Sequence, residues 1–168
     1  MRAGRDERAW VRGARAGSAS DLEALFRAHW PRAYRAAYLV THDAAAAEDI
    51  AQEAFLAAVR HLDRFDRRRP FGPWLHRIAV NRAIDWTRSR RLRGEVPLEE
   101  AASPSGQRAP GDDVMAALAR LPPEQRAVIV MRYLLEFTPG EIADALDVPR
   151  GTVNSRLRRG LDTLAEEL

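Results

Sequence analysis

The chain has 168 residues, of which 46% are hydrophobic, so it can bury a core, and wholesale disorder is excluded. It has no cysteine, which excludes disulfides, thiolate metal sites and thiol redox sensing. It also has no signal peptide and no apolar run of membrane-spanning length, so we expect a cytoplasmic protein without membrane contact. The 27 basic residues, all arginine, nearly balance 24 acidic ones, so the distribution of charge says more about partners than the net charge of +3.

The N-terminal part predicts a long helix after an irregular start. Residues 1–17 are rich in arginine, alanine and glycine, and we expect them to be frayed, with some helix around Trp10. Ser18 and Ser20 are suitable N-caps for the helix that follows. Leucines and aromatic residues then recur at helical spacing, and the pattern keeps its phase across Pro31, which favours one kinked helix over two.

A second helix is expected from Ala44 to Leu62, with an apolar inner line along one side. A neighbouring polar face carries Asp49, Gln52, Glu53, Leu56 and Arg60. From the residues alone, this face is interpreted as an ordinary solvated helix surface.

The loop from Asp63 to Pro73 concentrates positive charge beside aromatic rings. It holds three consecutive arginines and two phenylalanines: Arg67, Arg68, Arg69, Phe65 and Phe71. Arginines next to aromatic side chains in a loop suit stacking on unpaired bases. An ordinary solvated loop explains the same residues equally well.

The stretch from Phe71 to Arg93 predicts a helix that has an apolar stripe and a separate polar face. The polar face carries Arg77, Asn81, Asp85 and Arg88, about one turn apart. From residue 60 to residue 93, eleven arginines stand against three aspartates, a local net charge of +8. A field of this size favours a polyanionic partner, and a solvated basic helix is the alternative.

Residues 94–111 differ in composition from the segments on either side. They are rich in proline, glycine and serine, hold few large apolar side chains and turn acidic, which predicts a flexible linker. We therefore expect an all-α chain of two small helical domains, residues 1–93 and 112–168, joined by this linker. In the free protein the linker is expected to be unstructured.

The second domain predicts a helix-turn-helix. Thr138 is expected to cap a short helix, with Glu141 completing a capping box, and residues 147–149 form a tight turn before the last helix begins at Arg150. The outer side of that last helix offers groups that read base edges and phosphates in a major groove: Arg150, Thr152, Asn154, Ser155, Arg156 and Arg159.

Three motifs in order resemble a bacterial RNA polymerase sigma factor of the extracytoplasmic-function group, which keeps the second and fourth conserved regions of the sigma-70 family. They are DIAQEAF from Asp49, PFGPWLHRIAVNRAIDWTRSRR from Pro70, and LPPEQRAVIVMRYLLEFTPGEIADALDVPRGTVNSRLRRGLDTL from Leu121. The resemblance covers about residues 18–166.

The resemblance implies that core RNA polymerase and promoter DNA are partners, with the beta-prime clamp helices and the beta flap as docking sites. It assigns polymerase binding to Asp49, Gln52, Glu53 and Phe55, although Phe55 fits a core position equally well. It assigns melting and capture of the minus-ten element to Arg67, Arg68, Arg69, Arg77, Asn81 and Arg88.

The resemblance also assigns the minus-thirty-five element to the last helix, through the six residues named above for its outer side. Members of the group often carry arginine or lysine where this chain has Asn154, whose amide reads adenine well, so the target sequence is not transferred. Many members are held by an anti-sigma factor, and the same kind of partner is possible for this chain.

We interpret the chain as a sigma factor that is not an enzyme and needs no cofactor or metal. A stand-alone transcriptional regulator is the first alternative, but it leaves the first domain unexplained. A helical enzyme or metal protein is the second. Against it, the histidines lack i, i+4 pairing and an H-E-x-x-H arrangement: His29, His42, His61 and His76.

Overall fold

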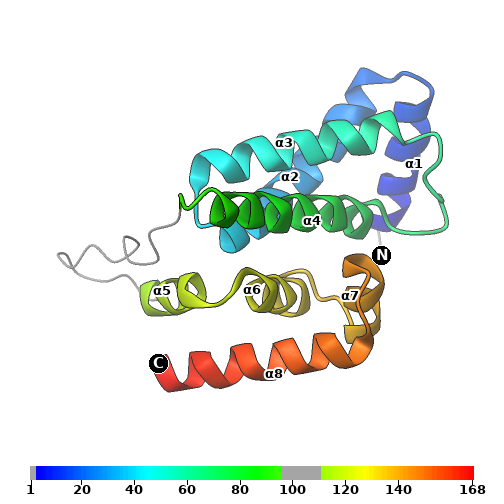
Figure 1. Ribbon diagram of the computed structural model, residues 1–168. Coiled ribbons are helices and arrows are strands. Elements are labelled where there is room, and N and C mark those ends of the chain that lie inside the picture. Colours follow the sequence, from blue (N-terminus) through cyan, green and yellow to red (C-terminus); the bar gives the residue numbers. More distant parts are fainter. Residues whose placement is uncertain (1–2, 96–110) are drawn as a thin grey trace.

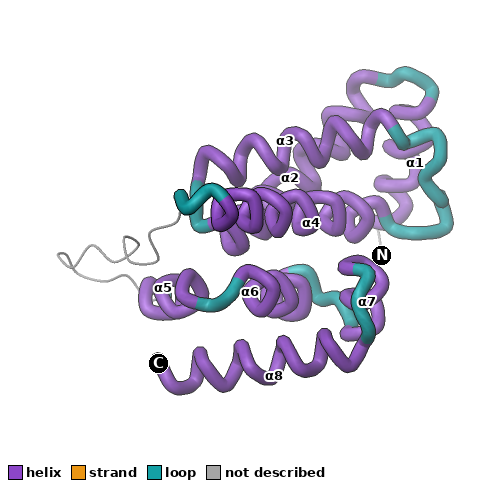
Figure 2. Tube along the Cα trace, viewed as in Figure 1, coloured by secondary structure: helices purple, strands orange, loops and turns teal. Residues whose placement is uncertain are grey.

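A computed structural model describes residues 3–95 and 111–168, with side chains described from residue 6 onward, and over these ranges the chain is helical without strands (Figures 1 and 2). The first unit consists of α1 (Ala3–Arg15), α2 (Ala19–Thr41), α3 (Ala44–Arg60) and α4 (Phe71–Leu92). The second consists of α5 (Asp112–Arg120), α6 (Pro123–Ile129), the π-helical turn η1 (Val130–Leu134), α7 (Pro139–Leu146) and α8 (Arg150–Glu167). Most of the predicted linker, 96–110, lies outside the described residues.

The frayed start that we expected is instead a docked helix. α1 buries Val11, which is 3% exposed, among the apolar side chains of α2, α3 and α4. Near its C-terminal end, Arg15 donates a hydrogen bond of 2.7 Å to the backbone carbonyl of Asp63. The helix is therefore fixed to the rest of the first unit at both its apolar face and its end.

The long helix α2 is continuous across Pro31, as its periodicity predicted. Ser18 caps it, with its side chain accepting from the backbone N–H of Asp21, and His42 ends it in the left-handed conformation. α3 and α4 pack along α2, so that α2 is the central element of the first unit. The buried side of α2 packs against both α3 and α4.

The second unit ends in the expected helix-turn-helix. The side chain of Thr138 accepts from the backbone of Glu141, and the Glu141 carboxylate accepts from the Thr138 backbone, which completes a capping box. Asp147 takes a left-handed conformation in the turn between α7 and α8. α8 then lies close against α6, where a Cβ on Gly160 would come within 2.7 Å of Ile129 Cδ1.

The two units do not stand apart. Figure 1 shows α5 and α6 as a layer between α4 on one side and α8 on the other. The buried side chains at the seam form one continuous core, made from the first unit by Ala36, Val40, Val80, Ala83 and Ile84 and from the second by Leu118, Leu121, Val128 and Met131. No helix in the described ranges has the length and apolarity needed to cross a membrane.

The close approach of α8 to α6 generates a stability prediction. Gly160→Val places branched carbons where Ile129 already lies, and we expect overpacking to lower the free energy of unfolding by about 1–3 kcal/mol. Gly151→Val is the matched control, because nothing lies within 4 Å of a Cβ there. Urea unfolding followed by circular dichroism measures both variants, and equal stability of the two would contradict the tight α6–α8 contact.

Candidate nucleic-acid and polymerase interfaces

The polar face predicted on α3 is exposed. Asp49, Gln52 and Glu53 all lie on the surface, and the opposite side of the helix is anchored in the core by Ile50 and Ala54. Glu53 forms an ion pair of 3.0 Å with Arg82 on α4. The face is thus rigidly held and accessible, which are two properties that a docking surface needs.

Phe55 is not part of that accessible face. It is 7% exposed and its ring meets Phe26 edge-on with 5.1 Å between ring centroids, so it packs the core beneath the helix. The apolar group that does reach the surface is Leu56, which is 47% exposed and stands one turn from Gln52. Sequence reasoning put Leu56 on this face but did not assign it to the polymerase-binding site. A leucine among the polar side chains of an exposed face was the signal that could have identified it.

The loop after α3 separates its arginines from its aromatic rings. Arg67, Arg68 and Arg69 are exposed, whereas Phe65 is 8% exposed and Phe71 is 1% exposed. The prediction that these two phenylalanines stack on unpaired bases is therefore wrong for this conformation. The rings hold the loop from beneath instead, with the Phe65 ring tilted against Trp74 at 4.7 Å.

A cavity of about 130 Å³ opens between this loop and α1. The loop lines one wall with its three arginines, and α1 lines the other with Glu7, Arg8 and Val11. Sequence reasoning missed the three α1 residues, because their position against the loop follows from the docking of α1. The helical pattern around Trp10 was the available signal.

Glu7 is held firmly at this cavity. Its carboxylate lies 2.8 Å from His29 Nε2 on α2 and accepts from the backbone N–H of Gly72 at 3.3 Å. The hydrogen bond with His29 lowers the pKa of Glu7, against the opposing effect of partial burial. The adjacent His76 is 4% exposed, and its burial, together with the nearby His29, lowers its pKa to about 4.

The polar face of α4 points partly to solvent and partly to the second unit. Arg77 is exposed. Asn81 donates from its side-chain amide to the backbone carbonyl of Ala145 on α7 at 3.0 Å. Arg88 forms an ion pair of 3.2 Å with Glu124 on α6. Asn81 is therefore paired within the chain, whereas Arg88 makes an ion pair and still leaves 53% of its side chain exposed.

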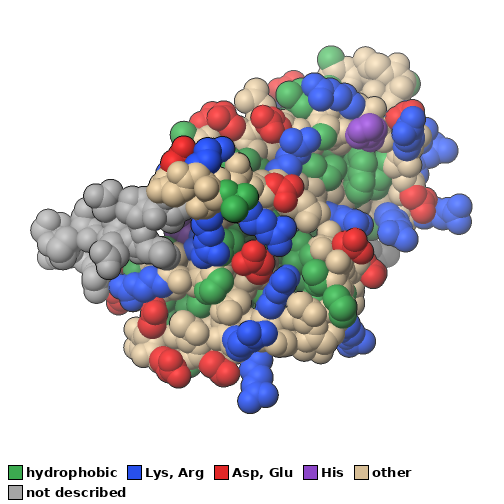
Figure 3. All heavy atoms as spheres, in the orientation of Figure 1, with side chains coloured by type: hydrophobic (Ala, Val, Ile, Leu, Met, Phe, Trp, Pro, Cys, Tyr) green, Lys and Arg blue, Asp and Glu red, His purple; other side chains and the backbone are tan. Residues whose placement is uncertain are grey.

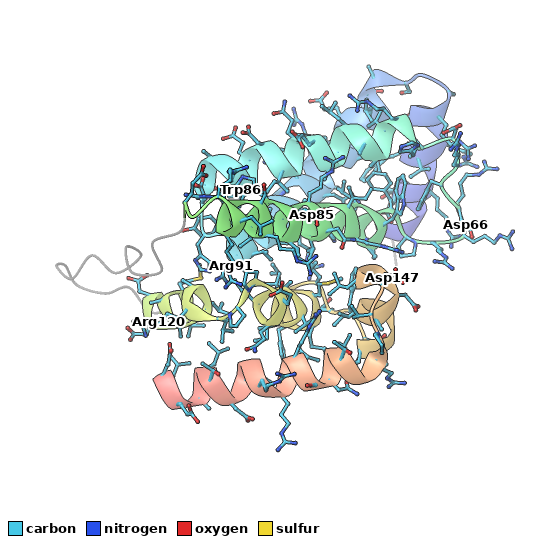
Figure 4. All side chains as sticks on the ribbon, viewed as in Figure 1. Asp66, Asp85, Trp86, Arg91, Arg120 and Asp147 are labelled. Carbon is cyan, nitrogen blue, oxygen red and sulfur yellow. The ribbon has the colours of Figure 1, made fainter. Side chains whose placement is uncertain are left out.

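Charge gathers along this seam and at the loop. Figure 3 shows arginine side chains around the loop after α3 and between α4 and the α5–α6 layer. Figure 4 shows Arg91 reaching from α4 toward that layer, while Asp85 stands further along α4.

Partial burial raises the pKa of Glu124, but hydrogen bonds from its backbone and from Arg88 outweigh this effect and hold the pKa below its usual value.

The outer face of α8 is turned away from the first unit (Figure 1). Arg150, Asn154 and Arg159 are exposed, and Thr152, Ser155 and Arg156 are half-buried. Arg159 donates to the Ser155 hydroxyl at 2.6 Å, which orders one turn of this face. The buried Val153 and Gly160 fix the opposite side of the helix against the second unit.

Models of known protein families match both helical units of the chain. The model of Sigma-70 region 2 matches residues 25–93, and that of Sigma-70, region 4 matches residues 111–164. The chain is 35% identical over 153 residues to the ECF RNA polymerase sigma factor SigW of Bacillus subtilis, covering 80% of this chain and 82% of SigW. It is 37% identical over 164 residues to the ECF RNA polymerase sigma factor SigL of Mycobacterium tuberculosis, covering 92% of both.

Two solved structures share the fold. CnrH, in complex with the cytosolic domain of CnrY, matches with a TM-score of 0.70 and 25% identity, covering 96% of both chains. The sigma factor RpoE of Bartonella quintana, in complex with the anti-sigma factor NepR, matches with a TM-score of 0.71 and 24% identity, covering 88% of this chain and 96% of that one.

The buried His76 generates a prediction for pH dependence. Its folded pKa lies below the ordinary value of 6.5, so the unfolded chain takes up a proton first, and stability falls as the pH drops from 6.5 toward 4. The slope from this group is at most about 1.4 kcal/mol per pH unit. His76→Met should flatten this part of the stability profile, whereas His61→Met, at an exposed site, should not. Identical profiles for the two variants would contradict the assignment.

Proposed function

The chain belongs to the extracytoplasmic-function group of the sigma-70 family, and we propose that it binds core RNA polymerase and directs promoter recognition, DNA melting and transcription initiation. The observation that carries the proposal is that both helical units match sigma-70 regions, in order, at 25–93 and 111–164. The polymerase performs the chemistry, and this chain supplies the contacts that select the start site.

For polymerase docking we propose the face of α3 formed by Asp49, Gln52, Glu53 and Leu56. Its exposure and its rigid support from the core favour this role. Leu56 adds an apolar contact to a face otherwise made of carboxylates and an amide. Such a contact matters because apolar groups that lose their water contribute much of the free energy of binding at interfaces. Phe55 supports this face from inside the core.

For the minus-ten element we propose the loop arginines, Arg77, Asn81 and Arg88, together with the cavity beside the loop. Exposed guanidinium groups hold the backbone of a single strand, and the cavity beside the loop offers a place for a base that leaves the helix. Glu7, held by His29 and by the backbone N–H of Gly72, would accept a hydrogen bond from an exocyclic amine and would disfavour a phosphate at that point.

For the minus-thirty-five element we propose the outer face of α8, with Arg150 and Arg156 on phosphates or guanine and Asn154 on adenine. The tight turn before α8 and the capping box on α7 hold this helix at a fixed angle, which supports entry into a major groove. A protein inhibitor of the anti-sigma kind is a further proposed partner, since the similar folds of CnrH and RpoE were solved in complexes with CnrY and NepR.

The docking proposal predicts that Gln52→Ala combined with Glu53→Arg weakens binding to core polymerase by at least tenfold, because an attractive carboxylate becomes a repulsive cation. The melting temperature should change little, since both side chains are exposed. Arg82→Ala is the matched control: it removes the Glu53 ion pair without altering α3. Fluorescence polarisation with labelled chain measures the affinity, and normal binding by the double variant would remove this face from the docking surface.

The strand-capture proposal predicts that replacing Arg67, Arg68 and Arg69 by serine leaves a closed promoter complex that forms but does not melt. Permanganate reactivity of thymines measures opening in holoenzyme assembled with the variant. A promoter carrying a pre-melted bubble provides the control, because it should restore much of the lost transcription if opening is the impaired step. Unchanged permanganate reactivity together with normal transcription would exclude the loop from the mechanism.

A further inference from the structure

The helix α1 brings two of its arginines to the loop that follows α3. Figure 1 shows this loop running beside α1. A surface hollow of about 540 Å³ opens between the two segments, wider than the cavity already described. The residues that line it are Arg8 and Arg15 of α1 and Phe65, Asp66, Arg67 and Arg68 of the loop.

The hollow gathers positive charge with little compensation. Four arginines and one aspartate line it, a formal charge of +3. Asp66 accepts from the backbone N–H of Arg68 at 3.0 Å and lies 3.6 Å from the guanidinium of the same residue, so this carboxylate is already engaged. Within the described part of the chain, no hydrogen bond or ion pair joins the guanidinium of Arg8 or Arg67 to another group. A bound polyanion would lower the repulsion among these cations, so the hollow favours such a ligand.

Three contacts hold α1 in place at the hollow. The buried side chain of Val11 anchors the middle of the helix in the core. Glu7 accepts from the backbone N–H of Gly72, at the start of α4. Arg15 donates to the backbone carbonyl of Asp63 at the start of the loop. The arginines of α1 are therefore positioned before any ligand arrives, which reduces the entropy cost of binding.

The hollow and the cavity proposed for a base differ in one side chain each that matters for charge. Glu7 lines the cavity but not the hollow, whereas Arg15 lines the hollow but not the cavity. Arg8, Arg67 and Arg68 line both, so the two openings adjoin. A carboxylate repels a phosphate and a guanidinium binds one, so a nucleotide with its base in the cavity would place its phosphate in the hollow.

We propose that α1 forms a second phosphate-binding wall for single-stranded DNA, in which Arg8 and Arg15 contact the backbone of a strand that also meets Arg67 and Arg68. This inference rests on the proposed function of the loop and extends it to a helix outside the matched family region, 25–93. Arg8 and Arg15 lie about 10 Å apart along the axis of α1, so the wall spans more than one phosphate group. Such contacts position a strand and carry no sequence information.

The free chain is suitable for testing this wall, because the arginines of α1 and of the loop are exposed in this conformation. The probe is a labelled single-stranded oligothymidylate of about ten nucleotides, a length typical of single-strand sites. We expect Arg8→Ser to weaken its binding about threefold or more. The slope of log affinity against log salt should become shallower by about 0.7, the value for one phosphate contact on a single strand. Fluorescence anisotropy measures both quantities.

A matched control lies on the same helix. Arg12 is exposed and does not line the hollow, so Arg12→Ser removes an equal charge one turn from Arg8 and should leave the salt slope unchanged. Arg8→Lys keeps the cation and should recover most of the affinity. Circular dichroism verifies that each variant is folded. Arg8→Glu provides a second, independent variant at the same exposed position, and it should bind more weakly than Arg8→Ser.

A free nucleotide offers the same phosphate chemistry as a strand, and ATP is the probe for that source. If the strand is the ligand, ATP should displace the oligonucleotide no better than sodium chloride of equal ionic strength. Displacement by micromolar ATP that is lost in Arg8→Ser would overturn the assignment to a strand. An oligonucleotide with uncharged methylphosphonate linkages should abolish the difference between Arg8→Ser and Arg12→Ser, and a persisting difference would show that Arg8 does not act on phosphate.

Equal salt slopes for Arg8→Ser and Arg12→Ser would overturn the inference, and so would the absence of binding by the unmodified chain at low salt. Replacement of Arg67, Arg68 and Arg69 by serine separates this failure from failure of the proposed function. If the loop variant binds the oligonucleotide weakly while Arg8→Ser binds it normally, the strand function of the loop stands and α1 has no part in it. If the loop variant also binds normally, the strand function proposed for the loop fails.

Discussion

A single buried guanidinium, that of Arg126, joins the two halves of the molecule. Its hydrogen bonds reach carbonyls at the end of α2 and at the end of α5, and those carbonyls would otherwise lie at a dry seam without partners. Burial lowers its pKa to about 10, so it remains charged at neutral pH. The hydrogen bonds to three carbonyls offset part of the cost of burying the charge, although the buried Nε makes none, so packing of α6 against α2 is favoured in the geometry that keeps these bonds.

α1 has a comparable effect on the loop that follows α3. Its residues lie outside the matched part of the first unit, 25–93, yet Glu7 and Arg8 complete the wall of the cavity beside Arg67–Arg69. Arg15 ties the end of α1 to the start of that loop. The loop arginines are therefore presented from a supported backbone, and the chain entropy that any ligand of theirs would have to overcome is lower than for a loop without this support.

Local pattern was sufficient to predict much of this structure, and long-range contacts account for the rest. The helices α2, α3, α4, α7 and α8, the Thr138–Glu141 capping box and the exposed groups on α8 follow from periodicity and capping chemistry, which act over a few residues, whereas α1 was expected to be frayed. Asn81 and Ala145 are 64 residues apart, and no local signal marks a carbonyl as the partner of an amide. Burial of Phe71 beneath the loop likewise depends on the docking of α2 and α3.

The packing of the two units leaves α8 and the polar face of α4 in different environments. On α8, Arg150, Asn154 and Arg159 face solvent, whereas Asn81 on α4 donates to the carbonyl of Ala145 in the second unit. Residues 60–93 carry a local net charge of +8, and because phosphate contacts need no particular sequence, such a field attracts polyanions of any sequence. Separation of the units exposes apolar side chains such as Val80 and Val128, and a partner that covers them stabilises the open form.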